Sequence, residues 1–162
     1  MFLLDSNVFM NASRLYYAPD IAPTFWEWLG NEHEKGNVAS IVRVREEIDD
    51  GEAGHLTTWA ASLPRTFWIK PGADTFPSLS QLSTWTMDPA RQYSRAARDQ
   101  FLRVADYYLV AQAHAADHTV VTFEKAEPHA KKRVAIPDVC MAMGVAYSEP
   151  FGIYRRLGLR FA

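Results

Sequence analysis

The sequence predicts an α/β fold in which helices cover both faces of a parallel β-sheet. Three observations support this fold class. Short apolar runs alternate along the chain with longer segments of helical periodicity. The first run, Phe2–Leu4, is apolar at every position, as expected of a strand buried on both faces of a parallel sheet. With 162 residues, 48% of them hydrophobic, the chain has the size and composition of one globular domain spanning residues 1–162.

The first part of the chain is expected to contain two strand–helix units. Ser6 or Asn7 can cap a first helix that runs through residues 10–15, because their side-chain oxygens accept the unpaired N–H groups of a helix start. A second helix is expected from Pro23 to Lys35, with proline in its first turn and Gly36 at its end. The elements expected next are a strand at 38–40, a helix from 40 to 48, a helix from 56 to 62 and a strand at 66–69.

The second half of the chain is expected to hold one long helix and two further strands. Residues 71–89 are rich in proline, serine and threonine, and are predicted to form a loop with one short helix. Residues 94–116 give the strongest helical pattern, because the segment is alanine-rich and its apolar residues recur at helical spacing. A strand is predicted at 119–122, and a short one at 134–136 leads into a last helix that starts near Pro137.

Composition narrows the class of protein. The single cysteine, Cys140, cannot form an internal disulfide and is expected to be buried, which favours a reducing, cytoplasmic location. No stretch approaches the roughly 20 apolar residues of a membrane helix, and the N-terminal apolar run is too short for a signal peptide. The net charge of −2 gives no overall attraction to nucleic acid, although basic residues gather locally. These groups are Arg91, Arg95, Arg98 and Arg103; Lys125, Lys131, Lys132 and Arg133; and Arg155, Arg156 and Arg160.

Four acidic residues, far apart in the chain, are placed where the predicted fold would bring them together. They are Asp5, Glu47, Asp106 and Glu124. Two of them follow predicted strands, and ligands of open parallel sheets bind outside the carboxyl ends of the strands. Two carboxylates at about 4 Å repel by roughly 4 kcal/mol at an effective dielectric near 20. Such a group must hold protons or bind a cation, and a hard divalent ion prefers oxygen ligands. A metal-dependent enzyme is therefore expected.

Each acid also has a purely structural interpretation. Asp5 could cap a helix, and Asp106 could be a favourable charge at a helix N-terminus. Glu46 and Glu47 are neighbours on one helix and point about 100° apart, so the sequence leaves open which of them faces the site. Asp138, after Pro137, could cap the last helix or touch the site.

The acids lie within segments that resemble the motifs of the PIN-domain nucleases, in the same order and over nearly the whole chain. The segments are Phe2–Phe9, Glu47-Ile48, Ala105–Ala113, Val120–Glu124, and the tail Ile136–Cys140 with Met143–Val145. The tail is similar to that of a prokaryotic subgroup, and many PIN proteins are toxins of toxin–antitoxin pairs. The sequence has glutamate at position 124, where most members have aspartate.

The resemblance implies a three-layer α/β/α sandwich with a central parallel sheet, acting as an endoribonuclease that uses Mg²⁺ or Mn²⁺. The implied catalytic and metal-binding residues are Asp5, Glu47, Asp106 and Glu124, with Asn7, Thr122 and Asp138 in support. The implied partners are an RNA substrate, a second copy of the chain in a homodimer, and a cognate antitoxin protein. No membrane association is expected.

Two other functions stay open at the sequence level. One is a PIN fold that binds RNA or a protein without cutting, which the glutamate at position 124 keeps in play. The other is a phosphatase of the haloacid-dehalogenase type, which also begins with a strand that ends in aspartate. That chemistry uses a second aspartate two residues later, where this chain has Asn7.

Overall fold

The computed structural model describes residues 1–161, and these form a three-layer α/β/α fold around a five-stranded parallel sheet. The strand order is β3-β2-β1-β4-β5. β1 is central, with Leu3 in register with Ala39 of β2 and Val120 of β4. The strands are β1 (Phe2–Leu4), β2 (Val38–Ile41), β3 (Trp68–Ile69), β4 (Thr119–Val121) and β5 (Tyr147–Ser148). The α/β fold class predicted from the sequence is confirmed.

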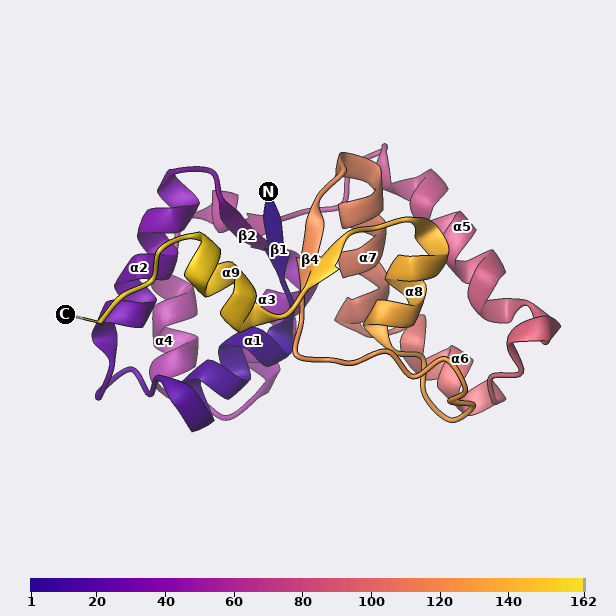
Figure 1. Ribbon diagram of the computed structural model, residues 1–162, viewed down its shortest axis with the longest axis horizontal. Helices are drawn as coiled ribbons and strands as arrows, with labels where there is room; N and C mark the ends of the chain where they lie inside the picture. Colours follow the sequence, from indigo (N-terminus) through magenta and orange to yellow (C-terminus); the bar gives the residue numbers. More distant parts are fainter. Residues whose placement is uncertain (162) are drawn as a thin grey trace.

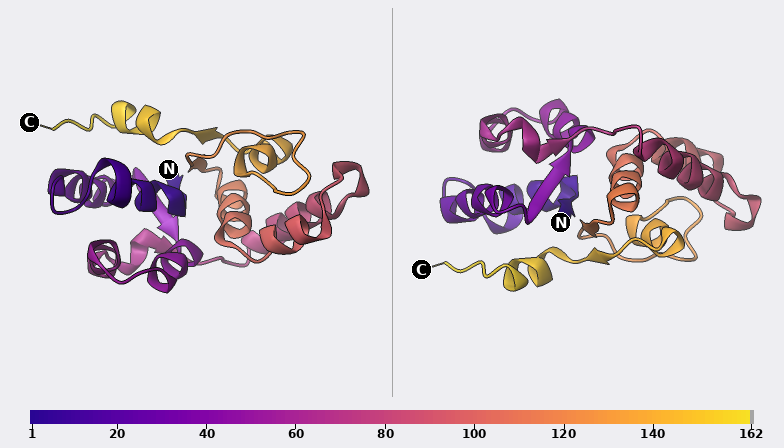
Figure 2. Two further views of the ribbon diagram at one scale, coloured as in Figure 1. Left: turned by 90° about the horizontal axis from the view of Figure 1, so that it is seen from below. Right: turned by 90° about the horizontal axis from the view of Figure 1, so that it is seen from above.

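Two layers of helices enclose the sheet (Figures 1 and 2). The first layer holds α1 (Ser6–Asn11), which continues as a π-helical turn over Ala12–Tyr16, with α2 (Pro23–Glu34), α3 (Val42–Asp50), α4 (His55–Ser62) and α9 (Pro150–Arg156). The second layer holds α5 (Thr75–Met87), α6 (Arg95–Phe101), α7 (Ala105–Ala116) and α8 (Ile136–Met143). Short 3-10 turns occupy Arg65–Phe67 and Pro89–Arg91.

Buried apolar residues hold the helices against the sheet and against one another. Leu3 and Leu4 of β1 are 1% exposed, so the central strand is apolar because helices cover it on both sides. In the first layer, Tyr154 of α9 packs edge-on against Phe25 and Trp28 of α2. These contacts place the adjacent aromatic residues of α2 inside the molecule.

The helix predicted to be short within residues 71–89 is instead α5, which runs from Thr75 to Met87. Its serine and threonine residues suggested a loop because their hydroxyls compete for backbone groups. Here the hydroxyls of Ser83 and Thr84 donate to the carbonyl of Ser80, one helical turn back. Buried positions such as Leu82 then pack this helix along α7, so tertiary burial overrides weak local propensity.

The long helix predicted over residues 94–116 is divided into α6 and α7. Ser94 caps α6 by accepting a hydrogen bond from the N–H of Ala97 at 3.1 Å. The start of α7 is fixed from outside, because the Glu47 carboxylate of α3 accepts the N–H of Ala105 at 3.1 Å. The division therefore follows from a contact between helices that the local sequence does not contain.

Other boundaries also differ from the sequence prediction. The first helix begins at Ser6, so Ser6 and Asn7 lie inside it and do not cap it. Residues 134–136 form no strand, because α8 already begins at Ile136. The predicted strand at 66–69 is reduced to Trp68–Ile69, and β5 and α9 were not predicted. No helix among residues 1–161 is long and apolar enough to span a membrane.

Candidate active site

The four predicted acids meet at the carboxyl-terminal edge of the sheet, between β1 and β4. Asp5 directly follows β1, and Glu124 lies three residues beyond the end of β4. Glu47 reaches this edge from α3, and Asp106 from the first turn of α7. From β1 the chain adds β2 and β3 on one side and β4 and β5 on the other. The site therefore lies at the switch point of the topology, where open α/β sheets bind ligands.

Asp5 is buried, with 2% of its surface exposed. Although it occupies the N-cap position of α1, its side chain makes no capping bond to the described chain. Its carboxylate instead accepts a hydrogen bond from the Thr122 hydroxyl at 2.8 Å. Burial, together with the charges of Glu124 and Glu47, raises the pKa of Asp5 to about 7, and the Thr122 hydrogen bond opposes the rise. The capping interpretation of Asp5 is therefore wrong.

Asp106 is the second acid with a strongly shifted pKa. Burial raises the pKa of Asp106 to about 8, helped in turn by the charges of Asp5, Glu124 and Glu47, while Arg133 lowers it. Its carboxylate accepts no hydrogen bond from the rest of residues 1–161. Asp106 is thus a desolvated acid in an acidic environment, with its oxygen atoms free to bind a cation.

The structure decides between the two neighbouring glutamates of α3. Glu47 holds the N–H of Ala105, and its charge acts on both Asp5 and Asp106. Glu46 points away and forms an ion pair with Arg43 at 3.2 Å, in which its side chain is 53% exposed. Glu47 is therefore the member of the acidic site, and Glu46 belongs to the solvated surface.

Glu124 differs from the other acids because protein donors already hold both of its carboxylate oxygens. Oε2 accepts the backbone N–H of Ile136 at 2.8 Å, and Oε1 is paired with the guanidinium of Arg133. Its side chain is 13% exposed. Glu124 thus lies near the acids while also closing the loop between β4 and α8.

Asn7 and Thr122 hold the backbone around the acids. The Asn7 side chain donates to the Thr122 hydroxyl at 3.0 Å and accepts the N–H of Phe123 at 3.1 Å. Thr122 in turn accepts the N–H of Glu124 at 3.0 Å while donating to Asp5. Both side chains therefore join the ends of β1 and β4. Asn7 also offers no second carboxylate for phosphatase chemistry.

Asp138 does not cap α8, the helix that it was expected to cap. The N-cap position of α8 is Ala135, and Asp138 lies within the first turn. The Asp138 carboxylate, 7% exposed, accepts the N–H of Glu127 with both oxygens, at 3.0 and 3.2 Å. Asp138 thus fixes the loop that carries Glu124 and Arg133, and it acts on the site only through that loop.

Nearly the whole chain matches one known protein family. Residues 2–161 match the family described as "Domain of unknown function (DUF4411)". The chain belongs to the DUF4411 family. Comparison of the DUF4411 chain with curated proteins and with solved structures gives no significant match.

The acids of this DUF4411 domain suit a hard divalent cation by their donor chemistry. All four offer carboxylate oxygens, and in Asp5 and Asp106 the charged form is disfavoured until a cation compensates it. Among residues 1–161, no three Asp, Glu, His or Cys side chains are placed closely enough to hold a metal ion as they stand. A cation could be held at this edge only if these side chains moved closer together.

Cys140 is near the acids but offers no nucleophile. Its side chain is fully buried, as predicted. Burial raises the pKa of the Cys140 thiol to about 12, and the charges of Asp5 and Glu124 add to the effect. The thiol is therefore protonated at neutral pH, which leaves the carboxylates as the reactive groups of the site.

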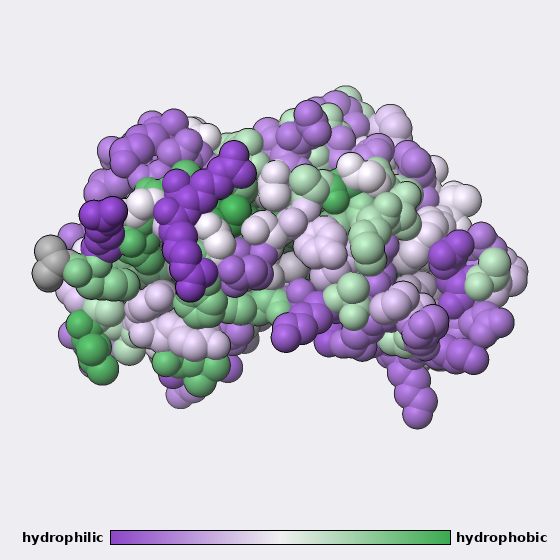
Figure 3. Space-filling view, in the orientation of Figure 1, coloured by the Kyte–Doolittle hydropathy of each residue, from purple (hydrophilic) through white to green (hydrophobic). Residues whose placement is uncertain are grey.

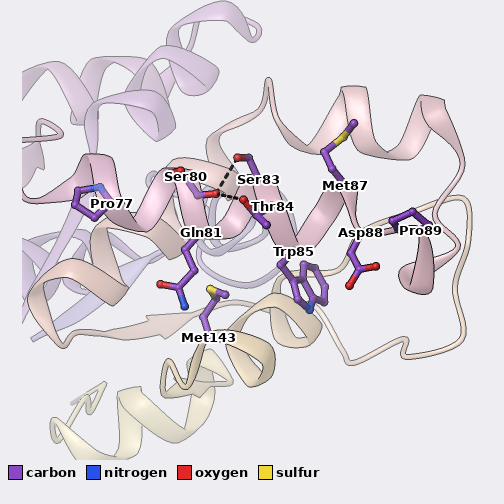
Figure 4. Close-up of a pocket in the computed structure, with 10 residues that line it drawn as sticks. All are labelled: Pro77, Ser80, Gln81, Ser83, Thr84, Trp85, Met87, Asp88, Pro89 and Met143. Carbon is purple, nitrogen blue, oxygen red and sulfur yellow. Dashed lines mark hydrogen bonds between the residues drawn. The ribbon is translucent and has the colours of Figure 1, made fainter.

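A larger hollow of the DUF4411 domain lies elsewhere, along α5 and next to Met143 of α8 (Figure 4). It measures about 1090 Å³ and is lined by apolar side chains such as Trp85, Met87 and Met143, with hydroxyl groups between them. Figure 3 shows one face of the molecule, on which hydrophobic residues form small patches among hydrophilic ones. Because none of the four acids lines this hollow, the sheet edge is the better candidate for a reaction site.

Sequence reasoning missed Arg133 as a residue of the site. It was noted only as a member of a basic group with Lys125, Lys131 and Lys132. Its guanidinium pairs with Glu124, and its charge reaches Asp106. Nothing in the local sequence distinguishes Arg133 from the neighbouring lysines, so only the folded loop shows its position.

Proposed function

We propose that this DUF4411 domain is a metal-dependent endoribonuclease that hydrolyses RNA phosphodiester bonds with Mg²⁺ or Mn²⁺. One observation carries the proposal: Asp5 and Asp106 are desolvated at the switch point of a parallel sheet and, with Glu47 and Glu124, oppose one another's ionisation. Carboxyl groups gathered in this way must hold protons or bind a cation, and a hard divalent ion suits their oxygen atoms. The resemblance to PIN-domain nucleases supplies the substrate class.

The residues of the site then have separate tasks. A divalent ion held by Asp5, Glu47 and Asp106 would activate water and stabilise the charge that develops on the phosphate. Thr122 orients the Asp5 carboxylate, and Glu47 fixes the start of α7 and hence the position of Asp106.

The helices that carry two of the acids also carry a cation–aromatic pair of a kind that binds unpaired RNA. Arg43 of α3 lies over the ring of Tyr108 of α7, with Cζ 4.6 Å from the ring centroid. The same two helices carry Glu47 and Asp106. Aromatic rings and guanidinium planes stack on nucleobases, and basic side chains contact phosphates. This pair therefore supports single-stranded RNA as the substrate.

The proposal is tested by incubating the protein with structured and single-stranded RNAs in Mg²⁺, in Mn²⁺ and in a chelator. Cleavage is expected with either ion and not with the chelator. Glu47→Gln and Glu46→Gln form a matched pair, because the two residues are adjacent on α3 and only Glu47 faces the site. Glu47→Gln and Asp5→Asn are expected to abolish cleavage, whereas Glu46→Gln retains it. Cleavage that survives the chelator or Asp5→Asn would exclude the proposed chemistry.

A second candidate is a domain that binds RNA or a protein without cutting. The observation in its favour is Glu124, whose carboxylate is already paired with Arg133 and the N–H of Ile136. This function predicts RNA affinity that is independent of Mg²⁺ and Mn²⁺, with no cleavage product under any of the conditions above. The same experiment therefore separates the two candidates.

The biological setting is proposed from the PIN resemblance alone. We propose that the domain is a cytoplasmic homodimer and the toxin of a type II toxin–antitoxin pair, and that a cognate antitoxin holds it inactive. Induced expression is then expected to arrest growth, and Asp5→Asn is expected to relieve the arrest. Co-expression with the product of an adjacent gene should also restore growth and yield a stable complex, and light scattering measures the oligomeric state.

A further inference from the structure

The proposed chemistry gives no role to Arg133, which lies beside the acids. It lies on the loop between β4 and α8, and its positive charge acts on Asp106 as well as on Glu124. A basic side chain beside these acids opposes the binding of a metal ion there, because the two positive charges repel. Its presence there calls for a function other than packing, since the guanidinium side chain is 53% exposed.

The contacts of Arg133 leave much of its guanidinium available. One terminal nitrogen pairs with Glu124, and the other lies 3.6 Å from Oε1 of Glu127. A guanidinium has five N–H donors in a planar fork, and a half-exposed one directs several of them outward. The fork matches the paired oxygens of a phosphate in geometry and charge.

Glu124 does not depend on Arg133 for its position. The N–H of Ile136 holds Oε2, whereas Arg133 contacts only Oε1. Asp138 independently fixes the loop through the N–H of Glu127. If Arg133 turns away, the Glu124 carboxylate stays in place with Oε1 free, so the pair can open without unfolding the loop.

A small cavity lies where Arg133 and Asp106 meet α6. It measures about 50 Å³, and Gln100 and Phe101 of α6 line its far side. Because one water occupies about 30 Å³, this space admits a water molecule or a phosphoryl oxygen and is too small for a base. A group bound there lies beside both Arg133 and Asp106.

We propose that Arg133 binds an RNA phosphate beside the acids, and that its ion pair with Glu124 is the resting arrangement. This inference rests on the proposed function. On binding, Arg133 exchanges the Glu124 carboxylate for a phosphate of the RNA, which releases Oε1 of Glu124 toward the acidic site. Arg133 is in this account a substrate-binding residue whose resting partner is one of the acids.

The test measures the affinity of a fluorescent single-stranded RNA in the Asp5→Asn background, with Mg²⁺ held constant. Arg133→Gln is expected to weaken binding about ten-fold, as loss of a charged hydrogen-bonded contact does. It should also reduce the slope of log affinity against log salt by about 0.7, the value for one phosphate contact to a single strand. Arg95→Gln removes the same charge from a side chain that is 95% exposed, and is expected to change neither quantity.

Thermal denaturation of each variant confirms that the proteins compared are folded. Arg133→Lys should recover part of the affinity, since lysine keeps the charge and loses the fork. The inference is overturned if Arg133→Gln leaves the affinity and the salt slope unchanged, or if Arg95→Gln alters them equally. Cleavage is measured separately, with the protein that retains Asp5. If Arg133→Gln lowers the RNA affinity but the protein that retains Asp5 cleaves no RNA, the nuclease function is rejected and the phosphate-binding role of Arg133 stands. If that protein cleaves RNA but Arg133→Gln leaves the affinity unchanged, the role of Arg133 is rejected and the nuclease function stands.

Discussion

The Glu47 carboxylate on α3 accepts a hydrogen bond from the backbone N–H of Ala105, the first residue of α7. One acid of the candidate site therefore fixes the helix that carries another, Asp106. The contact spans 58 positions of the sequence and joins the two helix layers at the edge of the sheet. Glu47 therefore has a structural role at the start of α7 and a proposed role in metal binding. Different substitutions of Glu47 can distinguish the two roles.

Glu47→Gln keeps an oxygen that can accept the N–H of Ala105, whereas Glu47→Ala removes it. We expect Glu47→Ala to lower the free energy of unfolding by about 1 kcal/mol, as loss of a helix cap does, and Glu47→Gln to lower it by less. Both variants should lack metal-dependent cleavage. Urea denaturation measures the stabilities, and equal destabilisation by the two changes would contradict the capping role.

Stability should depend on pH through Asp5 and Asp106. Their folded pKa values, about 7 and about 8, lie above the ordinary value of 3.8, so the folded chain keeps protons that the unfolded chain has released. This contribution is full below pH 3.8 and is lost as pH rises through the folded values. Without divalent cations, the free energy of unfolding is therefore expected to fall between about pH 4 and pH 8.

Asp5→Asn provides the control for this pH dependence. It removes one titrating group and also the charge that raises the pKa of Asp106. The fall in stability over the same pH range should therefore be shallower in the variant. Denaturation at several pH values measures it, and an unchanged slope would show that these acids do not control the dependence.

The fold was largely predictable because burial leaves a local signal in short parallel strands. The apolar run Phe2–Leu4 and the proline and glycine that bound α2 each specify an element from neighbouring residues alone. The failures have the opposite cause. α5 is helical because Leu82 and its neighbours pack on α7, and the break before Ala105 is set by Glu47. Both depend on contacts that are distant in sequence.

Some residues of the candidate site were predictable from the local sequence, and others were not. Asp5 and Glu124 were found because a strand precedes each of them, and strand ends share one edge of a parallel sheet. The choice between Glu46 and Glu47 required the orientation of α3 relative to α7. Arg133 was missed because its place depends on how the loop after β4 closes through Glu124 and Asp138.

Divalent cations should stabilise the folded protein, and more so at high pH. Above pH 8 both buried acids are charged, so their repulsion is greatest and a bound cation relieves most. An ion at 100 times its Kd adds about 2.7 kcal/mol to the free energy of unfolding. Differential scanning fluorimetry with Mg²⁺ or Mn²⁺ should show a larger rise in Tm at pH 8.5 than at pH 5.5. Asp106→Asn should remove most of the rise, and an equal shift in that variant would place the ion elsewhere.

Gln112 gives a prediction that is independent of the acids. It lies on α7, six residues beyond Asp106, and is 5% exposed, yet neither amide atom has a hydrogen-bond partner among residues 1–161. An unsatisfied buried polar group costs about 1–3 kcal/mol, and methionine fills a similar volume without one. Gln112→Met is therefore expected to raise the free energy of unfolding by about 1–3 kcal/mol while cleavage is unchanged, since about 9 Å of helix separates it from Asp106. Urea denaturation measures the gain, and destabilisation instead would mean that buried water or a ligand satisfies the amide.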